Sequence, residues 1–346
     1  MNQPFPPSLG KLGDLPRAQL FSGTTALEEM PNLSQACGGA RLLVKRDDCT
    51  ELAFGGNKVR QLEFYLGDAQ AQRADTVLIT GAVQSNFARL AAAGARKLGM
   101  ECHIQLEERV AKTDPVYRSS GNVLLEKVLG AVLHSYPEGE DEEGADRRLN
   151  EIAQELKSAG RKSYVIPLAP GHAPLGALGY VVMAQELLQQ LNEMQVIPDE
   201  VVVASGSGAT HGGLLFGLRA LGSNVTVRGI CVRRNAQAQE PRIVQRCAEI
   251  ADLLGVSSPV DKSDVLVDDS FLAPGYGYAG QDTLAAITEG ARTESLMLDP
   301  TYTGKTFAGF LHRAKASDPK SNLVFVHTGG AVALFAYQTD LENFLV

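Results

Sequence analysis

The sequence lacks the features that would mark a membrane or nucleic-acid-binding protein. Nowhere do about 18 apolar residues follow one another, so no stretch predicts a transmembrane helix. No run of lysines or arginines forms a basic stripe, and the net charge is −8, which makes nucleic acids and anionic membranes poor candidate partners. The segment from Met1 to Gly13 has three prolines and no continuous apolar stretch, so we expect no signal peptide. A small molecule is the expected ligand.

The cysteines form no pattern typical of a disulfide framework or a zinc site. There are five of them, an odd number, and no two are closer than a dozen residues. We therefore expect reduced thiols and a cytoplasmic protein. His211 and His327 each stand beside a glycine turn, but no second histidine or carboxylate completes a metal-binding set there, so we expect no metal.

The chain of 346 residues, 44% of them apolar, is long enough for two domains or one large one. Strands are expected at 41–46, 75–80, 102–106, 163–166, 199–204, 225–232 and 323–326. Helices are expected from Lys58 onward and at 87–98, 123–129, 149–159, 175–194, 211–221, 239–254 and 281–292. This alternation predicts an α/β fold with open, mostly parallel, twisted sheets and helices on both faces.

Two stretches have simpler interpretations. The run of β-branched residues at 199–204 is typical of a strand buried on both faces of a parallel sheet. The acidic stretch 137–146 is expected to be a solvated loop and a helix N-terminus, without a function of its own.

Three turns rich in glycine and polar residues follow predicted strands, at 81–86, 205–210 and 327–330. Ligands of open parallel sheets bind outside the carboxyl ends of the strands. We therefore expect these turns, together with Lys58, to form one cleft.

The turn 205–210 (SGSGAT) has the composition of a phosphate site. It offers main-chain N–H groups and three hydroxyls directly before a helix, whose N-terminus attracts anions. A tight strand-to-helix connection would have the same composition. A Walker loop is excluded at Gly304-Lys305 because Asp299 stands where it needs a glycine, and a dinucleotide motif is excluded because His211 stands where a third glycine would be.

Lys58 stands in the stretch GGNKVRQLE, where two glycines allow a tight turn close to a ligand and an amphipathic helix follows. Alone, it could be a solvated lysine at a helix start. Combined with a phosphate site and the hydroxyl and amide of Ser85 and Asn86, it fits a phosphorylated aldehyde held as a Schiff base. Pyridoxal 5'-phosphate is the natural candidate.

Four segments resemble one known family: KRDDCTELAFGGNKVRQLE, GAVQSNFARLAAAGARKLGM, LDPTYTGKTFAGF and HTGGAVALFAY. They are similar to the D-cysteine desulfhydrase and 1-aminocyclopropane-1-carboxylate deaminase family, pyridoxal phosphate enzymes of fold type II, related to the tryptophan synthase β chain. The resemblance implies a homodimer of two-domain subunits. It places a small domain at 58–163, inserted in a large cofactor-binding domain made of 1–57 and 164–346.

The resemblance also implies roles for particular residues. Lys58 would bind the cofactor aldehyde, Asn86 its ring hydroxyl, and Ser85 and Gln84 the substrate carboxylate. Tyr276 and Tyr302 match two tyrosines of the substrate pocket, although half-buried tyrosines also commonly line clefts without such a role. The residues expected to hold the cofactor phosphate are Ser205, Gly206, Ser207, Gly208, Ala209 and Thr210.

The expected reaction is elimination of the β-substituent of D-cysteine, which gives pyruvate, hydrogen sulfide and ammonia. Lys58 or Ser85 would take the Cα proton, and Tyr276 or Tyr302 would protonate the leaving group. Opening of 1-aminocyclopropane-1-carboxylate and elimination from L-cysteate are alternatives. A protein that kept the fold but only binds ligands is a remote one, and an intact Lys58 argues against it.

Two positions favour the desulfhydrase branch. Thr303 stands where the resembling deaminases have a glutamate beside the cofactor's pyridine nitrogen, and Thr328 stands where they have a leucine. A carboxylate would keep that nitrogen protonated, whereas a hydroxyl alone would leave it neutral. A neutral ring suits expulsion of thiolate better than cleavage of a carbon–carbon bond.

Overall fold

The computed structural model describes residues 5–168 and 171–346, and the chain divides into two compact units. The six-stranded unit comprises Met1–Leu15, Gly23–Cys49 and Ala173–Gly330, and the four-stranded unit comprises Pro16–Ser22, Thr50–His172 and Ala331–Val346. The domain limits expected from the sequence, with the inserted domain at 58–163, stay a prediction.

The six-stranded unit is built on a sheet with the strand order β1-β2-β10-β7-β8-β9. Only β1 pairs in an antiparallel direction. The strands are β1 (Leu27–Glu29), β2 (Arg41–Lys45), β7 (Glu200–Ser205), β8 (Thr226–Cys231), β9 (Leu266–Asp268) and β10 (Asn322–Val326). In β7, Val201, Val202 and Val203 are fully buried between neighbours on both sides, which confirms the prediction for 199–204.

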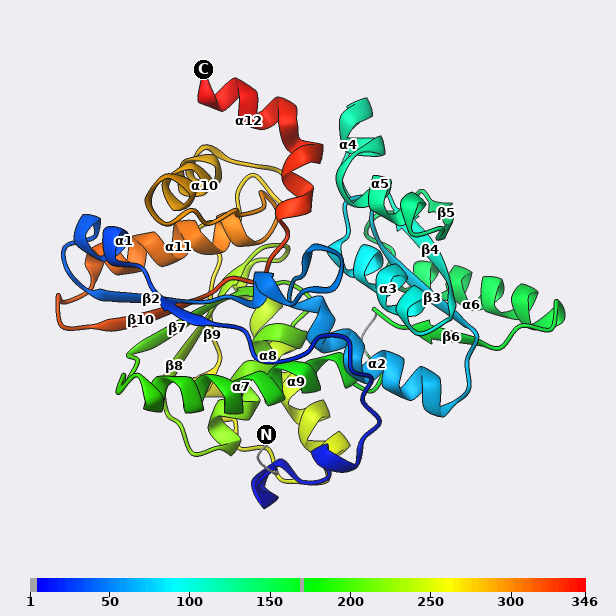
Figure 1. Ribbon diagram of the computed structural model, residues 1–346, viewed down its shortest axis with the longest axis horizontal. Coiled ribbons are helices and arrows are strands. Elements are labelled where there is room, and N and C mark those ends of the chain that lie inside the picture. The colour runs from blue at the N-terminus through cyan, green and yellow to red at the C-terminus, as the bar shows by residue number, and fades with distance from the viewer. Residues whose placement is uncertain (1–4, 169–170) are drawn as a thin grey trace. The chain divides into compact units, whose positions relative to one another are not determined.

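Helices cover both faces of this sheet (Figure 1). One layer has α7 (Leu175–Glu193), α8 (Ala209–Ala220) and α9 (Ala236–Leu254), and the other has α1 (Pro31–Ala36), α10 (Gln281–Glu294) and α11 (Thr303–Ala316). Helices α7 and α8 pack closely because α8 contains small residues. A Cβ at Gly213 would lie 2.2 Å from the main-chain oxygen of Ala177, so only glycine fits there.

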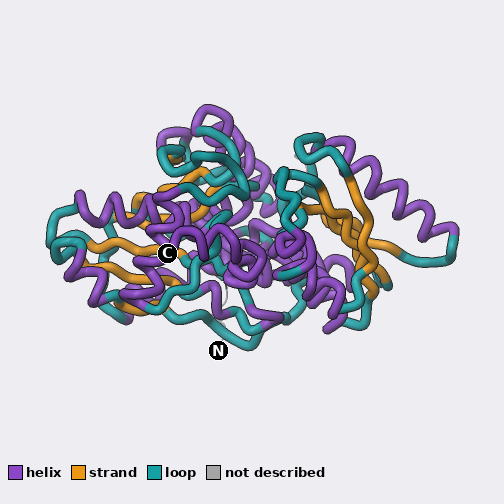
Figure 2. Tube along the Cα trace, turned by 90° about the horizontal axis from the view of Figure 1, so that it is seen from above, coloured by secondary structure: helices purple, strands orange, loops and turns teal. Residues whose placement is uncertain are grey.

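The four-stranded unit has an entirely parallel sheet with the order β5-β4-β3-β6. Its strands are β3 (Thr76–Ala82), β4 (Glu101–Glu107), β5 (Val132–Tyr136) and β6 (Ser163–Ile166). Its helices are α2 (Lys58–Ala71), α3 (Asn86–Lys97), α4 (Pro115–Ser119), α5 (Gly121–Val128), α6 (Glu142–Ser158) and α12 (Gln338–Leu345). Figure 2 shows that strands run between helices in both units. Leu149 and Ile152 of α6 pack on Leu78 of β3.

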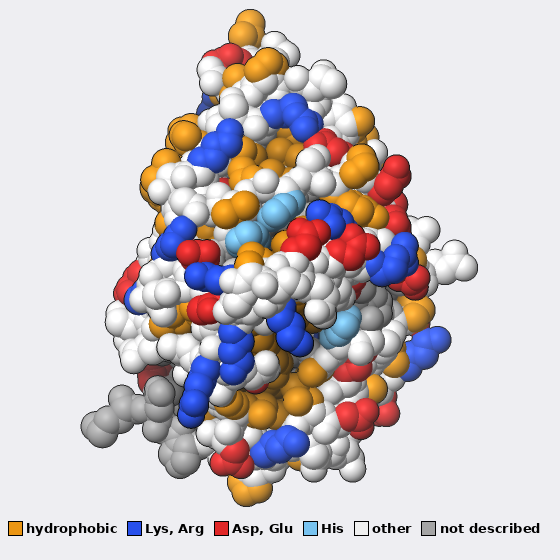
Figure 3. Space-filling model, turned by 90° about the vertical axis from the view of Figure 1, so that its right-hand side faces the viewer, with side chains coloured by type: hydrophobic (Ala, Val, Ile, Leu, Met, Phe, Trp, Pro, Cys, Tyr) orange, Lys and Arg blue, Asp and Glu red, His pale blue; other side chains and the backbone are white. Residues whose placement is uncertain are grey.

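Short 3₁₀ helices complete the described chain, at Pro7–Leu9, Leu12–Asp14, Asp47–Cys49, Leu52–Phe54, Lys262–Asp264 and Ala331–Tyr337. None of the helices within 5–168 and 171–346 combines the length and the apolar character needed to cross a bilayer. Acidic and basic side chains are interspersed on the face seen in Figure 3.

The expected α/β alternation is confirmed, but the sequence pattern did not predict seven of the elements: β1, β5, β9, α1, α4, α11 and α12. Strands β1 and β9 have only three residues each, and β5 (VLHSY) is a partly exposed edge strand without a clear alternation. Helix α11 was missed because two glycines interrupt its apolar pattern. The acidic stretch does lead into a helix, since Asp141 caps α6 by accepting the N–H of Gly144.

Candidate functional site

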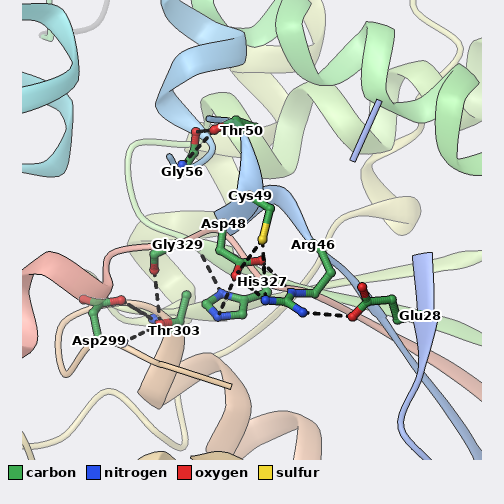
Figure 4. A network of polar contacts seen from close by, with 10 residues as sticks. All are labelled: Glu28, Arg46, Asp48, Cys49, Thr50, Gly56, Asp299, Thr303, His327 and Gly329. Atoms are coloured by element: carbon green, nitrogen blue, oxygen red, sulfur yellow. Dashed lines mark hydrogen bonds and ion pairs between the residues drawn. The ribbon is translucent and has the colours of Figure 1, made fainter. Parts of the chain in front are cut away.

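The loop that leads to Lys58 is held in place by hydrogen bonds within the four-stranded unit. The buried Thr50 hydroxyl donates to the Gly56 oxygen at 2.9 Å and accepts the Gly56 N–H at 2.8 Å (Figure 4). Arg89 Nη2 donates to the Gly55 oxygen at 2.9 Å. Phe54, Gly55 and Gly56 have φ values of 67°, 63° and 124°, and this backbone is costly for the non-glycine residue. The loop is therefore fixed despite its glycines.

Lys58 begins α2 as a partly buried amine with few polar neighbours. Its Nζ donates to Gln61 Oε1 at 3.2 Å and lies 5.1 Å from the ring centroid of Phe87. Burial lowers the pKa of Lys58 to about 8. About one-tenth of the amine is therefore unprotonated at pH 7, far more than at the ordinary lysine pKa, and this is the form that attacks a carbonyl carbon.

Ser85 lies at the N-cap of α3, the first helix after β3. Its Oγ accepts the N–H of Ala88 at 3.1 Å, so the hydroxyl proton stays available for a ligand. A Cβ at Gly81 would lie 2.7 Å from Ser85 Oγ, and this explains a glycine at the end of β3.

The Gln84 side chain is engaged inside the four-stranded unit. Its Nε2 donates to the main-chain oxygens of Tyr117 at 2.5 Å and Ser120 at 3.0 Å, and its Oε1 accepts the Asn122 N–H at 2.9 Å. Because both amide protons have acceptors, the side chain has no donor left for a carboxylate. Any contribution of Gln84 to substrate binding would come from its main chain.

Asn86 is oriented by Asn122. Asn122 Nδ2 donates to the Gln84 main-chain oxygen at 3.2 Å and to Asn86 Oδ1 at 3.1 Å. Since the Gln84 oxygen can only accept, Asn122 must present its NH₂ group on this side. Asn86 therefore uses its oxygen on Asn122, and its own NH₂ group can donate to a ligand such as a ring hydroxyl.

Helix α8 begins without a side-chain cap. Its N-cap is Gly208, whose φ of 95° favours glycine and which has no side chain that could accept an N–H of the first turn. The first N–H groups of a helix have no partner inside the helix, and the helix dipole adds positive potential. Thr210 is buried in this first turn and Ser207 is half-buried just before it. This arrangement suits a phosphate group.

The Ser205 hydroxyl points into the protein. Its Oγ accepts a hydrogen bond from Gln239 Nε2 at 2.9 Å and shares one with His211 Nδ1 at 3.0 Å. Burial lowers the pKa of His211 to about 4, so the imidazole is neutral near pH 7. A Cβ at Gly229 would lie 2.3 Å from His211 Nδ1, so glycine is needed there. Two buried side chains, Gln239 and His211, thus engage the Ser205 hydroxyl.

Tyr276 and Tyr302 are brought together in the six-stranded unit. Their hydroxyl oxygens are 2.5 Å apart and the rings meet edge to face. Lys305 of α11 holds the loop that precedes Tyr276, because its Nζ donates to the main-chain oxygens of Leu272 at 2.6 Å and Gly275 at 2.8 Å. Burial lowers the pKa of Lys305 to about 8.

Thr303 begins α11 and is fully buried against Asp299 (Figure 4). Its Oγ1 donates to Asp299 Oδ1 at 2.8 Å and accepts the Asp299 N–H at 2.7 Å. Thr328 is buried in the turn after β10, next to His327, whose Nδ1 accepts the Gly329 N–H at 3.2 Å. Burial lowers the pKa of His327, and its Nε2 lies 3.7 Å from Asp48 Oδ2.

The predicted residues thus form two groups, each inside one unit. The four-stranded unit contains Lys58, Gln84, Ser85 and Asn86, and the six-stranded unit contains 205–210, Tyr276, Tyr302, Thr303 and Thr328. That they form one cleft, and their individual roles, stay predictions. Within 5–168 and 171–346, no group of three or more His, Cys, Asp and Glu residues could hold a metal ion.

Sequence reasoning missed four residues that hold these groups: Thr50, Asn122, Asp299 and Lys305. A signal existed for Asp299, since an aspartate shortly before a helical stretch is typical of an N-cap. Asn122 and Lys305 act on residues that are distant in the chain, and Thr50 acts on Gly56 across an irregular loop, so no local pattern indicated these three.

Comparison with known proteins decides the family. A family model described as pyridoxal-phosphate dependent enzyme matches residues 18–329. The chain belongs to this family. The predicted cofactor, pyridoxal phosphate, is thereby confirmed, as is the prediction that the protein is an enzyme.

Individual relatives agree with this assignment. The chain is 40% identical to the D-cysteine desulfhydrase of Klebsiella pneumoniae over 336 residues, which cover 96% of this chain and 100% of the relative. It is also 40% identical to the D-cysteine desulfhydrase of Yersinia enterocolitica, covering 96% of this chain and 98% of the relative. A solved structure described as an ACC deaminase homologue superposes with a TM-score of 0.86 at 36% identity, over 98% of this chain and 100% of the other. O-ureido-L-serine synthase, with a TM-score of 0.65 at 17% identity over 95% of each chain, is similar in fold alone. The predicted fold type II class is confirmed.

The residues of this pyridoxal-phosphate dependent enzyme fit the cofactor. The uncapped N-terminus of α8 is suited to a phosphate, and the amine of Lys58 has a lowered pKa as an aldehyde-binding lysine requires. The free NH₂ group of Asn86 is suited to a ring hydroxyl.

Proposed function

We propose that this enzyme eliminates thiolate from D-cysteine, converting D-cysteine and water to pyruvate, hydrogen sulfide and ammonia. The observation that carries the proposal is the similarity to D-cysteine desulfhydrases at 40% identity over nearly the full length of both chains. Residues 303 and 328 support the same branch, since both are threonines here.

Each part of the cofactor would have a partner in this chain. Lys58 Nζ would bind the aldehyde carbon, the Asn86 amide would donate to the ring hydroxyl, and Thr303 would face the ring nitrogen. The phosphate would accept hydrogen bonds from the first N–H groups of α8 and from the hydroxyls of Ser207 and Thr210. When bound, pyridoxal phosphate withdraws electrons from the amino-acid Cα and so acidifies its proton.

The four-stranded unit would supply the substrate carboxylate site and the base. Ser85 would donate its hydroxyl proton to the carboxylate, because its oxygen already accepts the Ala88 N–H. The Gln84 side chain is engaged elsewhere, so we assign the carboxylate contact to its main chain. Lys58 and Ser85 both remain candidates for the group that takes the Cα proton. The lowered pKa of Lys58 favours the lysine.

The tyrosine pair would protonate the leaving sulfur. Of two hydroxyls 2.5 Å apart, one donates to the other, and the acceptor keeps its own O–H for a third partner. Whichever tyrosine accepts within the pair can donate its proton to the departing thiolate. The other tyrosine can then give its own proton to the phenolate that this leaves. Thr328 would add a hydroxyl contact to the substrate or the ring.

We also infer a homodimer in the cytoplasm. The family resemblance supports the dimer, and five free cysteines support a reducing compartment. Light scattering of the purified protein tests the dimer, and a monomer at micromolar concentration would contradict it.

The decisive experiment uses purified protein supplied with pyridoxal phosphate. D-cysteine, L-cysteine, L-cysteate and 1-aminocyclopropane-1-carboxylate are offered in turn, and sulfide, sulfite, pyruvate and 2-oxobutyrate are measured. Sulfide and pyruvate from D-cysteine are expected. Lys58→Ala should lower turnover by several powers of ten and abolish borohydride-stable mass addition at that residue. Lys127→Ala, an exposed lysine in the same unit, is the matched control.

A second candidate is the opening of 1-aminocyclopropane-1-carboxylate, favoured by the structural similarity to an ACC deaminase homologue. The two candidate reactions can be distinguished by changing Thr303 and Thr328 to the residues that the resembling deaminases have. Wild type and the double variant Thr303→Glu with Thr328→Leu are assayed on both substrates. Wild type that makes 2-oxobutyrate as readily as it makes pyruvate from D-cysteine would overturn the desulfhydrase assignment.

A further inference from the structure

Asp299 is fully buried just before the start of α11. Its carboxylate accepts four hydrogen bonds from the residues that follow it. Its Oδ2 accepts the N–H groups of Thr301 at 2.9 Å and Tyr302 at 3.0 Å. Its Oδ1 accepts the N–H of Thr303 at 2.8 Å and the Thr303 hydroxyl at 2.8 Å. Burial raises the pKa of the Asp299 carboxyl above its ordinary value, and the four donors and the positive end of the helix oppose this by favouring the ionised form.

The Thr303 hydroxyl has one proton and two lone pairs, and the protein uses most of them. The Asp299 N–H fills one lone pair at 2.7 Å. The proton has two acceptors, Asp299 Oδ1 at 2.8 Å and the Gly329 oxygen at 3.3 Å (Figure 4). Because both can only accept, the proton stays inside the protein. Thr303 has a single lone pair left for any ligand.

The neighbouring turn is shaped around this carboxylate. A Cβ at Gly330 would lie 2.7 Å from Asp299 Cγ, and Gly330 has a φ of 102°. The missing side chain of Gly330 therefore leaves the space that Asp299 occupies. The carboxylate is held between this turn and the main-chain N–H groups at the start of α11.

We propose that Asp299 is a positioning residue that makes Thr303 a hydrogen-bond acceptor toward the ring nitrogen of the cofactor, and so favours the protonated ring. The proposal rests on the proposed function, in which Thr303 faces that nitrogen. It differs from the sequence-based expectation that a threonine leaves the ring neutral. The negative charge that a glutamate would supply directly is supplied here one hydrogen bond further away.

The test measures the ring nitrogen itself. Wild-type protein and variants are reconstituted with pyridoxal phosphate labelled with ¹⁵N in the ring, and the ¹⁵N resonance is compared with those of the free cofactor in acid and in alkali. Wild type should give the protonated signal. In Asp299→Asn, the new amide can donate to Thr303 Oγ1 and release the hydroxyl proton toward the ring, so the signal should move to the unprotonated position.

Two further variants keep the test decisive if Asp299→Asn does not fold. Thr303→Val removes the acceptor and should also give the unprotonated signal. Thr303→Ser keeps the hydroxyl and should give the protonated signal, as wild type does. Asp299→Asn added to Thr303→Val should change nothing further, because the connection is already cut. Asp261→Asn, at an exposed cap in the same unit, should leave the signal unchanged.

An unprotonated ring in wild type, or a signal that none of the Asp299 and Thr303 variants moves, would overturn the proposal. The outcome is separable from that of the proposed function. Wild type that releases sulfide from D-cysteine with an unprotonated ring would sink only the role of Asp299. A protonated ring in protein that releases no sulfide would sink only the D-cysteine assignment.

Discussion

Helices α8 and α11 both belong to the six-stranded unit, but they begin in opposite ways. Helix α8 starts at Gly208, whose missing side chain leaves the first turn without a cap. Helix α11 starts behind Asp299, whose carboxylate accepts the N–H groups of Thr301, Tyr302 and Thr303. One N-terminus is left for an external anion, and the other is filled by an anion of the chain itself.

Under the proposed function, this difference would separate phosphate binding at α8 from ring binding at α11 within a single unit. A phosphate cannot compete at α11, because the donors there already have a buried carboxylate. At α8 the N-cap glycine offers no carboxylate, so a phosphate would replace water at these donors. Substitutions at the start of each helix can test this difference.

Removing the internal anion should have the largest effect. Asp299→Ala leaves three main-chain N–H groups without their acceptor in a buried site, so the free energy of unfolding should fall by about 3 kcal/mol. Urea unfolding of the cofactor-free protein measures this. Asp261→Ala, which removes an exposed cap, should cost at most about 1 kcal/mol. Equal losses would mean that Asp299 is not a buried cap.

Removing hydroxyls at the open helix should weaken cofactor binding. Ser207→Ala combined with Thr210→Ala deletes two hydrogen bonds to a charged phosphate, so the dissociation constant for pyridoxal phosphate should rise about 100-fold. Excess cofactor should restore part of the activity. Ser223→Ala, just beyond the other end of α8, should leave affinity unchanged. Unchanged affinity in the double variant would place the phosphate elsewhere.

The first turn of α8 should also make stability depend on pH. His211 has a pKa of about 4 in the folded protein, below its ordinary value of 6.5. A lowered folded pKa means that stability is complete above pH 6.5 and is lost as pH falls toward 4. Between pH 7 and pH 5, the cofactor-free protein should lose about 2 kcal/mol of unfolding free energy through this group. His211→Gln should remove that part of the loss, and an unchanged pH dependence would contradict a neutral buried imidazole.

The smallest effect is expected from the glycine that opens α8. Gly208→Ala forces a side chain into a φ of 95° and sets a Cβ 3.3 Å from Ile243 Cδ1, so the helix start must shift. We expect a loss of about 1 kcal/mol in stability and roughly a tenfold rise in the cofactor dissociation constant. Gly222→Ala has a similar φ of 81° and open space around it. It should cost similar stability with no change in affinity, and a matching change in affinity would show that strain alone is responsible.

The sequence predicted the strands and helices whose apolar pattern is strong, such as β7 and α7, and it predicted which turns are rich in ligand-binding residue types. It could not predict how those side chains are used. Ser205 and Ser207 look alike in the sequence, yet Ser205 is held by Gln239, which follows 34 residues later. Gln84 looks like a free donor until Tyr117 and Ser120 take its amide protons. Asp299 entered the sequence argument only as the residue that rules out a Walker loop. Such pairings depend on tertiary packing, which no local pattern encodes.

The contacts of Lys305 have a consequence for motion. Its ammonium joins α11 to the main-chain oxygens of the loop that carries Tyr276, while Tyr302 directly precedes α11. The two phenols therefore belong to one rigid body, together with Thr303. In a hinge motion on the microsecond to millisecond scale, this body would move as a whole, and the 2.5 Å contact between the hydroxyls would persist. The proposed proton donor would thus be assembled before any substrate arrives.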